Sequence, residues 1–218
     1  MILLPTRSRL AATASALLLA LSGCGGDDDP ASGSGTLLPG FRVTVYYTPV
    51  ESFHSGPSES IAGCPSPDCS SGPLPLGAYP SSFLAAVRMQ GSGRLTSGPY
   101  AGQYLHGSLG GSFWISPIPS DAYGSPVQPF ETAAADDDVL PRGSRFRLVE
   151  PLLESGGSPL PPAVAARLLA STWNVQDHFE AGYGGALHVD LYVGEQQQAD
   201  FTSSPFYLML ENTTLEVF

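Results

Sequence analysis

Apolar and polar residues alternate between positions 187 and 193, and this pattern predicts a half-buried β-strand. The alternating residues are Leu187, His188, Val189, Asp190, Leu191, Tyr192 and Val193. Successive side chains of a strand point to opposite faces of its sheet. The imidazole, the carboxylate and the phenol therefore share one face, where they line either a polar groove or a solvated surface.

The rest of the chain predicts an all-β fold of short strands and frequent turns, because its apolar runs are short and it contains 25 Gly and 21 Pro. Further strands are expected at residues 41–47, 83–89, 111–115, 145–149 and 206–210. One or two short helices accompany them, the clearest from about Pro161 to Ser171, where two prolines stand at the start. Its apolar residues form one face: Val164, Leu168 and Leu169.

The N-terminus has the pattern of a bacterial lipoprotein export signal. Arg7 and Arg9 precede an apolar stretch at residues 10–21, which is too short to span a bilayer. The Leu-Ser-Gly-Cys sequence that ends at Cys24 looks like a lipobox. We expect a signal peptide over residues 1–23 and lipid on Cys24, which tethers the protein to a membrane. A plain secretory signal cleaved nearby is the alternative.

The segment after Cys24 is expected to be a flexible tether, because residues 24–40 are mostly Gly, Ser, Asp and Pro. The folded body should then be residues 41–218, a single domain whose length leaves no room for a second large one. Gly25 directly after Cys24 resembles the sorting signals of enterobacterial lipoproteins, and this resemblance implies the outer membrane, facing the periplasm. We expect a monomer in the cell envelope.

The two remaining cysteines, Cys64 and Cys69, bracket a Pro-Ser-Pro-Asp loop. In an exported protein this spacing predicts a local disulfide. A metal site that includes His54 or His106 is the alternative, but the chain lacks a second Cys or His pair at metal-binding spacing. We therefore expect no metal ion and no other cofactor.

The charge of the chain argues against nucleic acid as a partner. All nine basic residues are arginine, and 20 acidic residues give a formal net charge of −11. Such a surface repels phosphate backbones. A glycan with neutral sugar hydroxyls is compatible with this charge, and so is a cationic protein bound by an interaction module.

Four segments carry a further pattern: a tyrosine-rich strand at residues 43–49, a Gln-Gly-Ser-Gly-Arg turn at residues 90–94, an aspartate-led segment at residues 136–144 and a closing segment at residues 177–194. In this order they resemble the three-aspartate (3D) domain and its membrane-bound lytic transglycosylase A (MltA) branch. The resemblance implies an all-β fold, a six-stranded double-psi β-barrel. It also implies peptidoglycan or another cell-wall glycan as the partner.

The resemblance further implies roles for individual residues. Asp136, Asp177 and Asp190 match the three aspartates of the family, and in the transglycosylase branch the aspartate at the Asp190 position is the catalytic acid and base. The residues implied to contact the glycan are Gln90, Gly91, Ser92, Gly93, Arg94, Gly184, Gly185, His188 and Tyr192. From the residues alone, the turn at 90–94 is equally a glycine hairpin with an exposed arginine.

A single carboxyl group suits the implied chemistry. Lytic transglycosylases use the 6-hydroxyl of the substrate sugar as the nucleophile and leave a 1,6-anhydro end, so one protein group first donates and then accepts a proton. To be protonated near neutral pH, Asp190 needs a raised pKa, which burial and the neighbouring Asp177 can provide. His188 or Tyr192 is placed to orient it.

Two departures from the family pattern leave another function open. Six residues separate Asp177 from the glycine pair at 184–185. The stretch between Arg94 and Asp136 is also too short for the inserted domain that forms the other wall of the glycan groove in the family. A glycan-binding lipoprotein without turnover, or a small substrate, is therefore the alternative. Aromatic candidates for stacking on sugars are Tyr46, Tyr47, Trp114 and Trp173.

Overall fold

The computed structural model describes residues 35–66, 68–107, 111–179 and 183–218. The expected signal peptide, the expected lipid attachment site at Cys24 and most of the expected tether lie outside these residues. The folded part begins earlier than the expected residue 41, because Leu37 and Leu38 already pair with the last strand of the chain. No helix among the described residues is long and apolar enough to cross a membrane.

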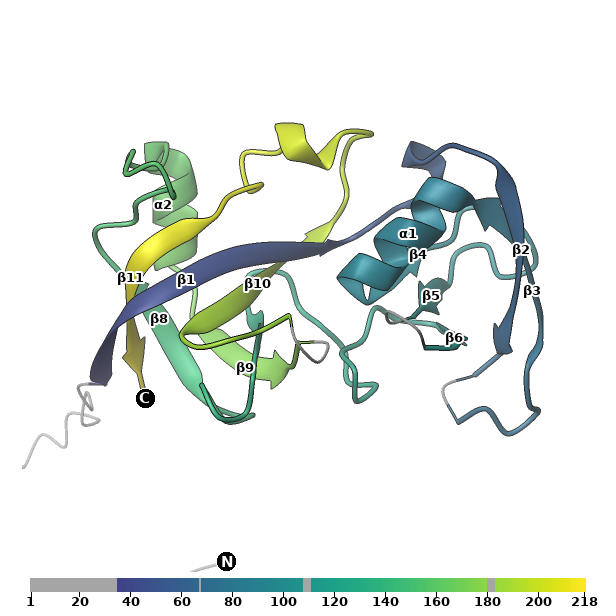
Figure 1. Cartoon of the computed structure of the whole chain (residues 1–218), viewed down its shortest axis with the longest axis horizontal. Coiled ribbons are helices and arrows are strands. Elements are labelled where there is room, and N and C mark those ends of the chain that lie inside the picture. The colour runs from purple at the N-terminus through teal and green to yellow at the C-terminus, as the bar shows by residue number, and fades with distance from the viewer. Residues whose placement is uncertain (1–34, 67, 108–110, 180–182) are drawn as a thin grey trace, which may run out of the picture. The chain divides into compact units, whose positions relative to one another are not determined.

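Six strands form a closed barrel (Figure 1). In chain order they are β1 (Thr36–Thr48), β7 (Thr132–Ala135), β8 (Arg145–Val149), β9 (Trp173–Asp177), β10 (His188–Glu195) and β11 (Leu210–Val217). Around the barrel the order is β1-β10-β7-β9-β8-β11, in which β1–β10 and β7–β9 are parallel pairs. The predicted fold class, an all-β six-stranded double-psi barrel, is confirmed. The expected helix is also present, as α2 (Pro162–Leu169).

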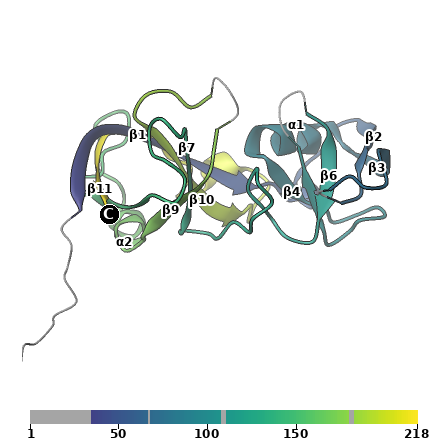
Figure 2. The ribbon, with the colours of Figure 1, turned by 90° about the horizontal axis from the view of Figure 1, so that it is seen from below.

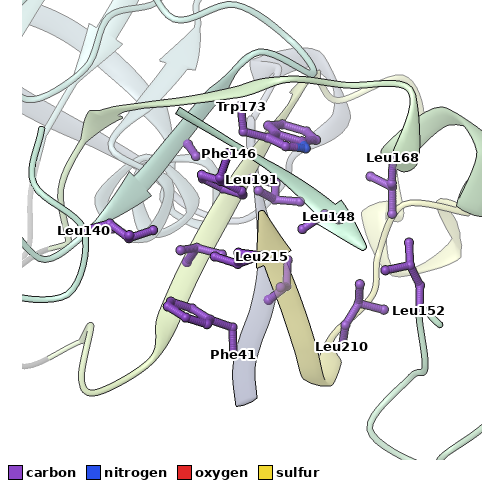
Figure 3. Close-up of a cluster of buried hydrophobic side chains, with 14 of the residues drawn as sticks. Phe41, Leu140, Phe146, Leu148, Leu152, Leu168, Trp173, Leu191, Leu210 and Leu215 are labelled. Atoms are coloured by element: carbon purple, nitrogen blue, oxygen red, sulfur yellow. The ribbon is translucent and has the colours of Figure 1, made fainter. Parts of the chain in front are cut away.

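Alternating side chains of these strands fill the barrel (Figure 3). In β8, Phe146 and Leu148 are buried, whereas Arg145 and Arg147 are exposed. Helix α2 adds Leu168 to the same core. Burial of one such apolar side chain contributes about 1.5–3 kcal/mol, so these rows fix which face of each strand turns inward.

A second sheet and a helix lie between β1 and β7 in the sequence. The elements are η1 (Glu51–Phe53), β2 (Ser58–Cys64), β3 (Leu74–Pro80), α1 (Ser81–Gln90), β4 (Ser92–Arg94), β5 (Tyr104–His106) and β6 (Phe113–Ser116). The strand order is β3-β2-β6-β5-β4, and Figure 2 shows α1 beside these strands. They enclose a hydrophobic core of their own: Leu76, Tyr79, Phe83, Leu84, Val87, Leu95, Leu105, Phe113 and Ile115.

We expected the barrel alone to account for residues 41–218, but the structure also contains this second sheet and helix. From the sequence, only the stretch between Arg94 and Asp136 was considered for additional structure. The additional elements in fact begin at Glu51, directly after β1, and include the glycine turn at residues 90–94. Three of the five strands of the second sheet span only three or four residues and carry little alternation, and among the five only β6 corresponds to an expected strand, at residues 111–115.

The second sheet is joined to the ends of two barrel strands. Val50, which follows β1, forms a β-bridge with Arg94, and the Arg94 amide donates to the Pro49 carbonyl at 2.7 Å. The Arg94 guanidinium lies 2.9 Å from the carboxylate of Glu195 at the end of β10. The Tyr104 hydroxyl donates to the same carboxylate at 2.7 Å. These contacts hold β4 and β5 against the ends of β1 and β10.

Two of the expected strands were wrong. Residues 83–89 belong to α1, because their buried side chains, at positions 83, 84 and 87, have helical spacing and pack into the second core. Of residues 206–210, only Leu210 lies in a strand, as the first residue of β11. Phe206 does not lie in a sheet; its ring packs edge-on against Phe130, with ring centroids 5.0 Å apart.

Cys64 and Cys69 form the expected disulfide. The bridge lies at the end of β2, where Cys64 is opposite Trp114 in the parallel β2–β6 pair. It therefore closes the loop that leaves the middle of the second sheet.

Replacement of Gly93 by alanine should destabilise the second sheet. A Cβ at this position would lie 2.5 Å from Val87 Cγ2 and 2.8 Å from Phe83 Cε2, so α1 would have to move. Overpacking of this kind costs roughly 1–3 kcal/mol. Gly156→Ala is the control, since a Cβ there meets no atom within 4 Å. Thermal unfolding should give a lower Tm for Gly93→Ala only, and equal Tm values would contradict the packing of α1 on this turn.

Candidate functional site

Two neighbouring parallel strands present polar side chains on one shared face. Strands β1 and β10 run in register, and the opposed polar residues are Arg42 with His188, Thr44 with Asp190 and Tyr46 with Tyr192. The residues between them are apolar and belong to the barrel core. The polar strand face predicted from residues 187–193 is therefore present, and β1 adds a second row of polar side chains beside it.

A cavity of about 320 Å³ lies over this face. Its barrel residues include Tyr46, Ala134, Asp177, His188 and Asp190. Residues 88–92, His106 and Trp114 come from α1 and the second sheet, and residues 120–122 from the loop that returns to the barrel. Both layers of the fold are thus needed to form the cavity.

Asp190 lines the cavity from the middle of β10. Thr44 Oγ1 donates a hydrogen bond to its Oδ1 at 2.9 Å, and Oδ2 has no side-chain partner among the described residues. Burial raises the pKa of Asp190 to about 7; the bond from Thr44 opposes this rise, and the charge of Asp177 adds to it. Near neutral pH the carboxyl group is divided between its two protonation states, as a group that both donates and accepts a proton requires.

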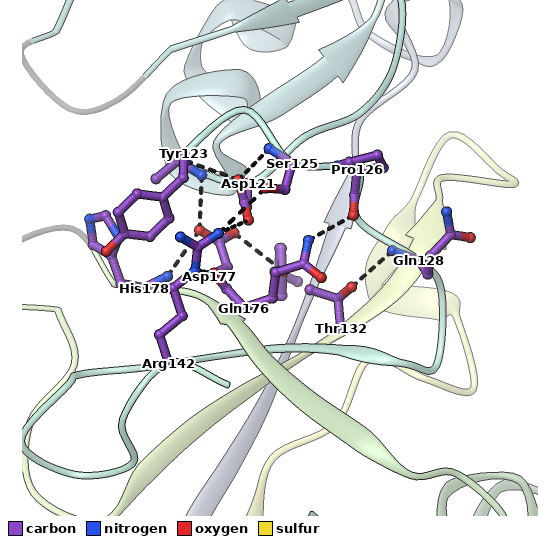
Figure 4. A network of polar contacts seen from close by, with 12 residues as sticks. Asp121, Tyr123, Ser125, Pro126, Gln128, Thr132, Arg142, Gln176, Asp177 and His178 are labelled. Carbon is purple, nitrogen blue, oxygen red and sulfur yellow. Dashed lines mark hydrogen bonds and ion pairs between the residues drawn. The ribbon is translucent and has the colours of Figure 1, made fainter. Parts of the chain in front are cut away.

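Asp177, at the end of β9, lines the same cavity but has both oxygens occupied (Figure 4). Its Oδ1 accepts from the backbone amides of Ala122 at 3.1 Å and His178 at 2.9 Å. Its Oδ2 accepts from the Tyr46 hydroxyl at 3.3 Å. Burial raises the pKa of Asp177, and the two amides oppose that rise. The residue ties the loop at 120–122 to the barrel and brings negative charge close to Asp190.

Asp121 is a third carboxylate at the cavity, and the sequence analysis did not identify it. Its Oδ1 accepts from the amides of Tyr123 at 2.9 Å and Ser125 at 2.7 Å, and its Oδ2 lies 3.2 Å from Arg142 Nη2 (Figure 4). The Arg142 guanidinium also stacks on the Tyr123 ring, 3.9 Å from its centroid. The Asp-Ala-Tyr-Gly sequence that starts at Asp121 predicts a turn, but it gives no sign of a cavity.

Asp136, predicted as a catalytic residue, does not line the cavity. Its Oδ2 accepts from the amide of Gly185 at 3.0 Å. Gly184 packs so closely on this carboxylate that no Cβ could be accommodated. Asp136 therefore holds the glycine turn that leads into β10, and neither glycine lines the cavity.

The Gln-Gly-Ser-Gly-Arg turn divides between the cavity and the second core. Gln90, Gly91 and Ser92 line the cavity. Gly93 and Arg94 do not, because the first packs against α1 and the second pairs with a carboxylate at the end of β10.

His188 lines the cavity, whereas Tyr192, its neighbour on the same strand face, does not. Tyr192 is buried, and its hydroxyl lies 2.7 Å from Thr48 Oγ1. Phe179 stacks on the His188 imidazole with ring centroids 4.5 Å apart. Burial lowers the pKa of His188, which favours the neutral ring near pH 7.

The second sheet contributes His106 and Trp114, whose rings stack at a centroid distance of 5.2 Å. Burial lowers the pKa of His106 to about 4, so this ring is uncharged at neutral pH. In sequence His106 was considered only as a metal ligand, and no group of three or more His, Cys, Asp or Glu able to hold a metal ion occurs among the described residues. Of the other aromatic candidates, Tyr46 lines the cavity and Trp173 lies in the barrel core.

The fold is similar to that of solved MltA-type lytic transglycosylases. One similar solved structure is E. coli MltA with bound chitohexaose, which is 14% identical, with 82% of this chain and 71% of that chain covered and a TM-score of 0.53. Another is a membrane-bound lytic murein transglycosylase from Agrobacterium tumefaciens, which is 13% identical, with 85% and 76% covered and a TM-score of 0.52. No protein-family model and no curated protein matches the chain.

Replacement of Asp190 by asparagine should stabilise the protein at pH 8. The folded-state pKa of about 7 lies above the usual unfolded value of about 3.9, so ionisation destabilises the folded state increasingly between these values and fully above pH 7. Asparagine avoids this cost, and we expect a gain of up to about 4 kcal/mol at pH 8 and little change at pH 4. Urea unfolding at both pH values measures it.

Asp200→Asn is the control of opposite sign. Hydrogen bonds from Thr202 and Ser203 lower the pKa of Asp200, so its ionised form stabilises the fold above the unfolded pKa and that contribution is lost as pH falls. This variant should lose stability at pH 8. An Asp190→Asn effect that is the same at pH 4 and pH 8 would contradict the burial of an ionisable group at this position.

Proposed function

We propose that this protein is a peptidoglycan lytic transglycosylase in which Asp190 is the single catalytic acid and base. The observation that carries the proposal is the difference between the carboxylates of one cavity. Asp121 and Asp177 have both oxygens engaged in hydrogen bonds or an ion pair, whereas the side-chain hydrogen bond to Asp190 reaches only Oδ1, and its pKa is about 7. Glycoside hydrolysis usually needs two available carboxyl groups, whereas attack by the sugar's own hydroxyl needs one.

In the proposed reaction, protonated Asp190 donates its proton to the glycosidic oxygen as the bond from that oxygen to C1 breaks. Positive charge develops on the sugar ring, and the negative charge of the Asp177 carboxylate favours it. The 6-hydroxyl oxygen of the same sugar then bonds to C1, and its proton passes to the Asp190 carboxylate. The product carries a 1,6-anhydro ring, and Asp190 is protonated for the next cycle.

The remaining surface of the cavity suits a glycan. Gln90 and Ser92 offer uncharged hydrogen-bonding groups for sugar hydroxyls, and Trp114 offers a ring on which a sugar face can stack. E. coli MltA has been solved with chitohexaose bound, which supports a glycan as the ligand of the similar fold here.

We also propose a location in the cell envelope, with lipid on Cys24 and the folded body facing the periplasm from the outer membrane as a monomer. The similar protein from A. tumefaciens is a membrane-bound enzyme. The Cys64–Cys69 disulfide supports an oxidising compartment.

A glycan-binding protein without turnover is the second candidate. It is favoured by the lengthened segment after Asp177, from which Phe179 and Tyr183 both line the cavity. Added aromatic surface increases contact with a bound sugar without any need for catalysis.

Mass spectrometry of the soluble products released from purified peptidoglycan tests the proposal. The protein should release 1,6-anhydromuropeptides, and Asp190→Asn should reduce their rate of release at least about 100-fold, because general acid–base catalysis contributes at least that much. Asp200→Asn, an exposed carboxylate that caps η2 (Phe201–Ser203), should retain the parent rate.

The outcomes separate the two candidates. Full activity of Asp190→Asn would eliminate Asp190 as the acid and base. Absence of products from every variant, with the protein still sedimenting with the wall, would establish the binding protein instead.

A further inference from the structure

A chain of hydrogen bonds runs from an exposed arginine to Asp190. Arg42 Nη2 lies 3.0 Å from His188 Nδ1. His188 Nε2 lies 2.8 Å from Thr44 Oγ1, which in turn lies 2.9 Å from Asp190 Oδ1. These residues form two opposed pairs that are neighbours on the polar face of the β1–β10 ladder, so strand register alone brings the hydrogen-bonding groups together. The proposed reaction itself assigns no task to Arg42, His188 or Thr44.

The chemistry of each group determines which atom donates and which accepts in each of these hydrogen bonds. A guanidinium can only donate, so the ring nitrogen that faces Arg42 must present a lone pair. In a neutral imidazole the ring hydrogen is then on Nε2, which donates to Thr44 Oγ1. The threonine hydroxyl has one hydrogen, and Asp190 Oδ1 is the remaining acceptor for it. This tautomer follows from the hydrogen-bond network.

The carbonyl of Gly184 marks the competing arrangement, because it lies 3.2 Å from the same Nδ1 atom of His188. It can accept only if Nδ1 carries the hydrogen. Thr44 would then donate to Nε2 and would have no hydrogen left for Asp190. Arg42 excludes this arrangement, since its own hydrogen would meet the one on Nδ1. Burial of the ring beneath Phe179 disfavours protonation of both nitrogens.

We propose that Arg42, His188 and Thr44 are positioning residues that keep the acidic proton of Asp190 on Oδ2, the oxygen available to the glycan. The inference deepens the proposed function and rests on it. A proton on Oδ1 would meet the hydroxyl hydrogen of Thr44, so the acid form of Asp190 carries its proton on Oδ2. After that proton has left, the same hydroxyl stabilises the carboxylate through Oδ1.

The charged and titratable groups around the chain come from several elements of the barrel. Arg42 and Tyr46 lie on β1 and Asp177 on β9, while Asp136 follows β7 and Glu211 lies on β11. Both Asp136 and Glu211 favour a protonated His188, and Arg42 opposes them. Loss of Arg42 therefore removes both the group that sets the donors and acceptors of the hydrogen-bond chain and the cation that keeps the His188 ring neutral.

The tautomer of His188 can be measured without any activity. Long-range ¹H–¹⁵N NMR of protein labelled at histidine, with His188→Gln to assign the signal, should show the Nε2–H form at pH 7.5. In Arg42→Met the signal should move to the Nδ1–H form, which donates to Gly184, or to the doubly protonated ring. An Nδ1–H tautomer in the parent protein, or no change in Arg42→Met, would overturn the proposal.

The titration of Asp190 gives a second readout. In Thr44→Val the carboxylate loses its donor, so ¹³C NMR of labelled aspartate should show the Asp190 proton held about ten-fold more tightly, a rise of about one pKa unit. Thr44→Ser keeps the hydroxyl and is the matched control, with the parent titration. A Thr44→Val titration that matches the parent would overturn the proposal.

Release of anhydro products across pH completes the experiment. Thr44→Val should be roughly 10- to 100-fold slower, and its alkaline loss of activity should move to higher pH, whereas Thr44→Ser should stay near the parent rate. If the NMR results hold but the parent releases no products, the chain stands as described and the proposed reaction fails. If the parent is active and Thr44→Val keeps its rate and pH profile, the positioning role fails and the proposed reaction stands.

Discussion

The parallel pairing of β1 with β10 is the constraint on which the candidate site depends. Because the two strands run in the same direction and in register, Thr44 lies opposite Asp190 although 146 positions separate them in the sequence. A slip of one residue would set a valine of β1 against Asp190 and turn the polar row of β1 into the barrel core. The buried valines and leucines of both strands prevent that slip, so the packing of the barrel core also determines the geometry of the site.

The second sheet changes the chemistry of a face that the barrel alone would leave in water. His106 and Trp114 from this sheet, together with the loop at residues 120–122, line the cavity that contains Asp190, which is left only partly exposed. Burial is the largest cause of its raised pKa, so the added layer acts on acidity even though its members make no hydrogen bond to Asp190. Three carboxylates share the cavity, and their different hydrogen-bond partners are what distinguish them.

Strong periodicity made parts of the fold predictable from the sequence. The alternation at residues 145–149 and 187–193 and the apolar stripe of α2 all correspond to elements of the structure. Helix α1 was missed because the largely apolar stretch at residues 83–89, interrupted only by Arg88, fits either period until its packing partners are known. Of the strands of the second sheet, only β6 was expected, at residues 111–115.

The site was predictable only in part, because a residue type does not reveal its partners. The sequence brought Asp177 and Asp190 to one place, and both line the cavity. It could not show that Asp136 would be engaged by a backbone amide 49 positions away, or that Asp121 would reach the cavity from a loop. Arg42 and Thr44 belong to the first strand, where nothing in the local pattern marks them as partners of β10.

The Cys64–Cys69 bridge makes one side of the cavity depend on the redox state of the compartment around it. Cys64 is paired with Trp114, one of the aromatic residues of the cavity wall. Thiols stay reduced in the bacterial cytoplasm and pair in oxidising compartments. In a reducing environment the chain would therefore lack this covalent closure beside Trp114. The redox state of the surroundings then sets how firmly one side of the cavity is held.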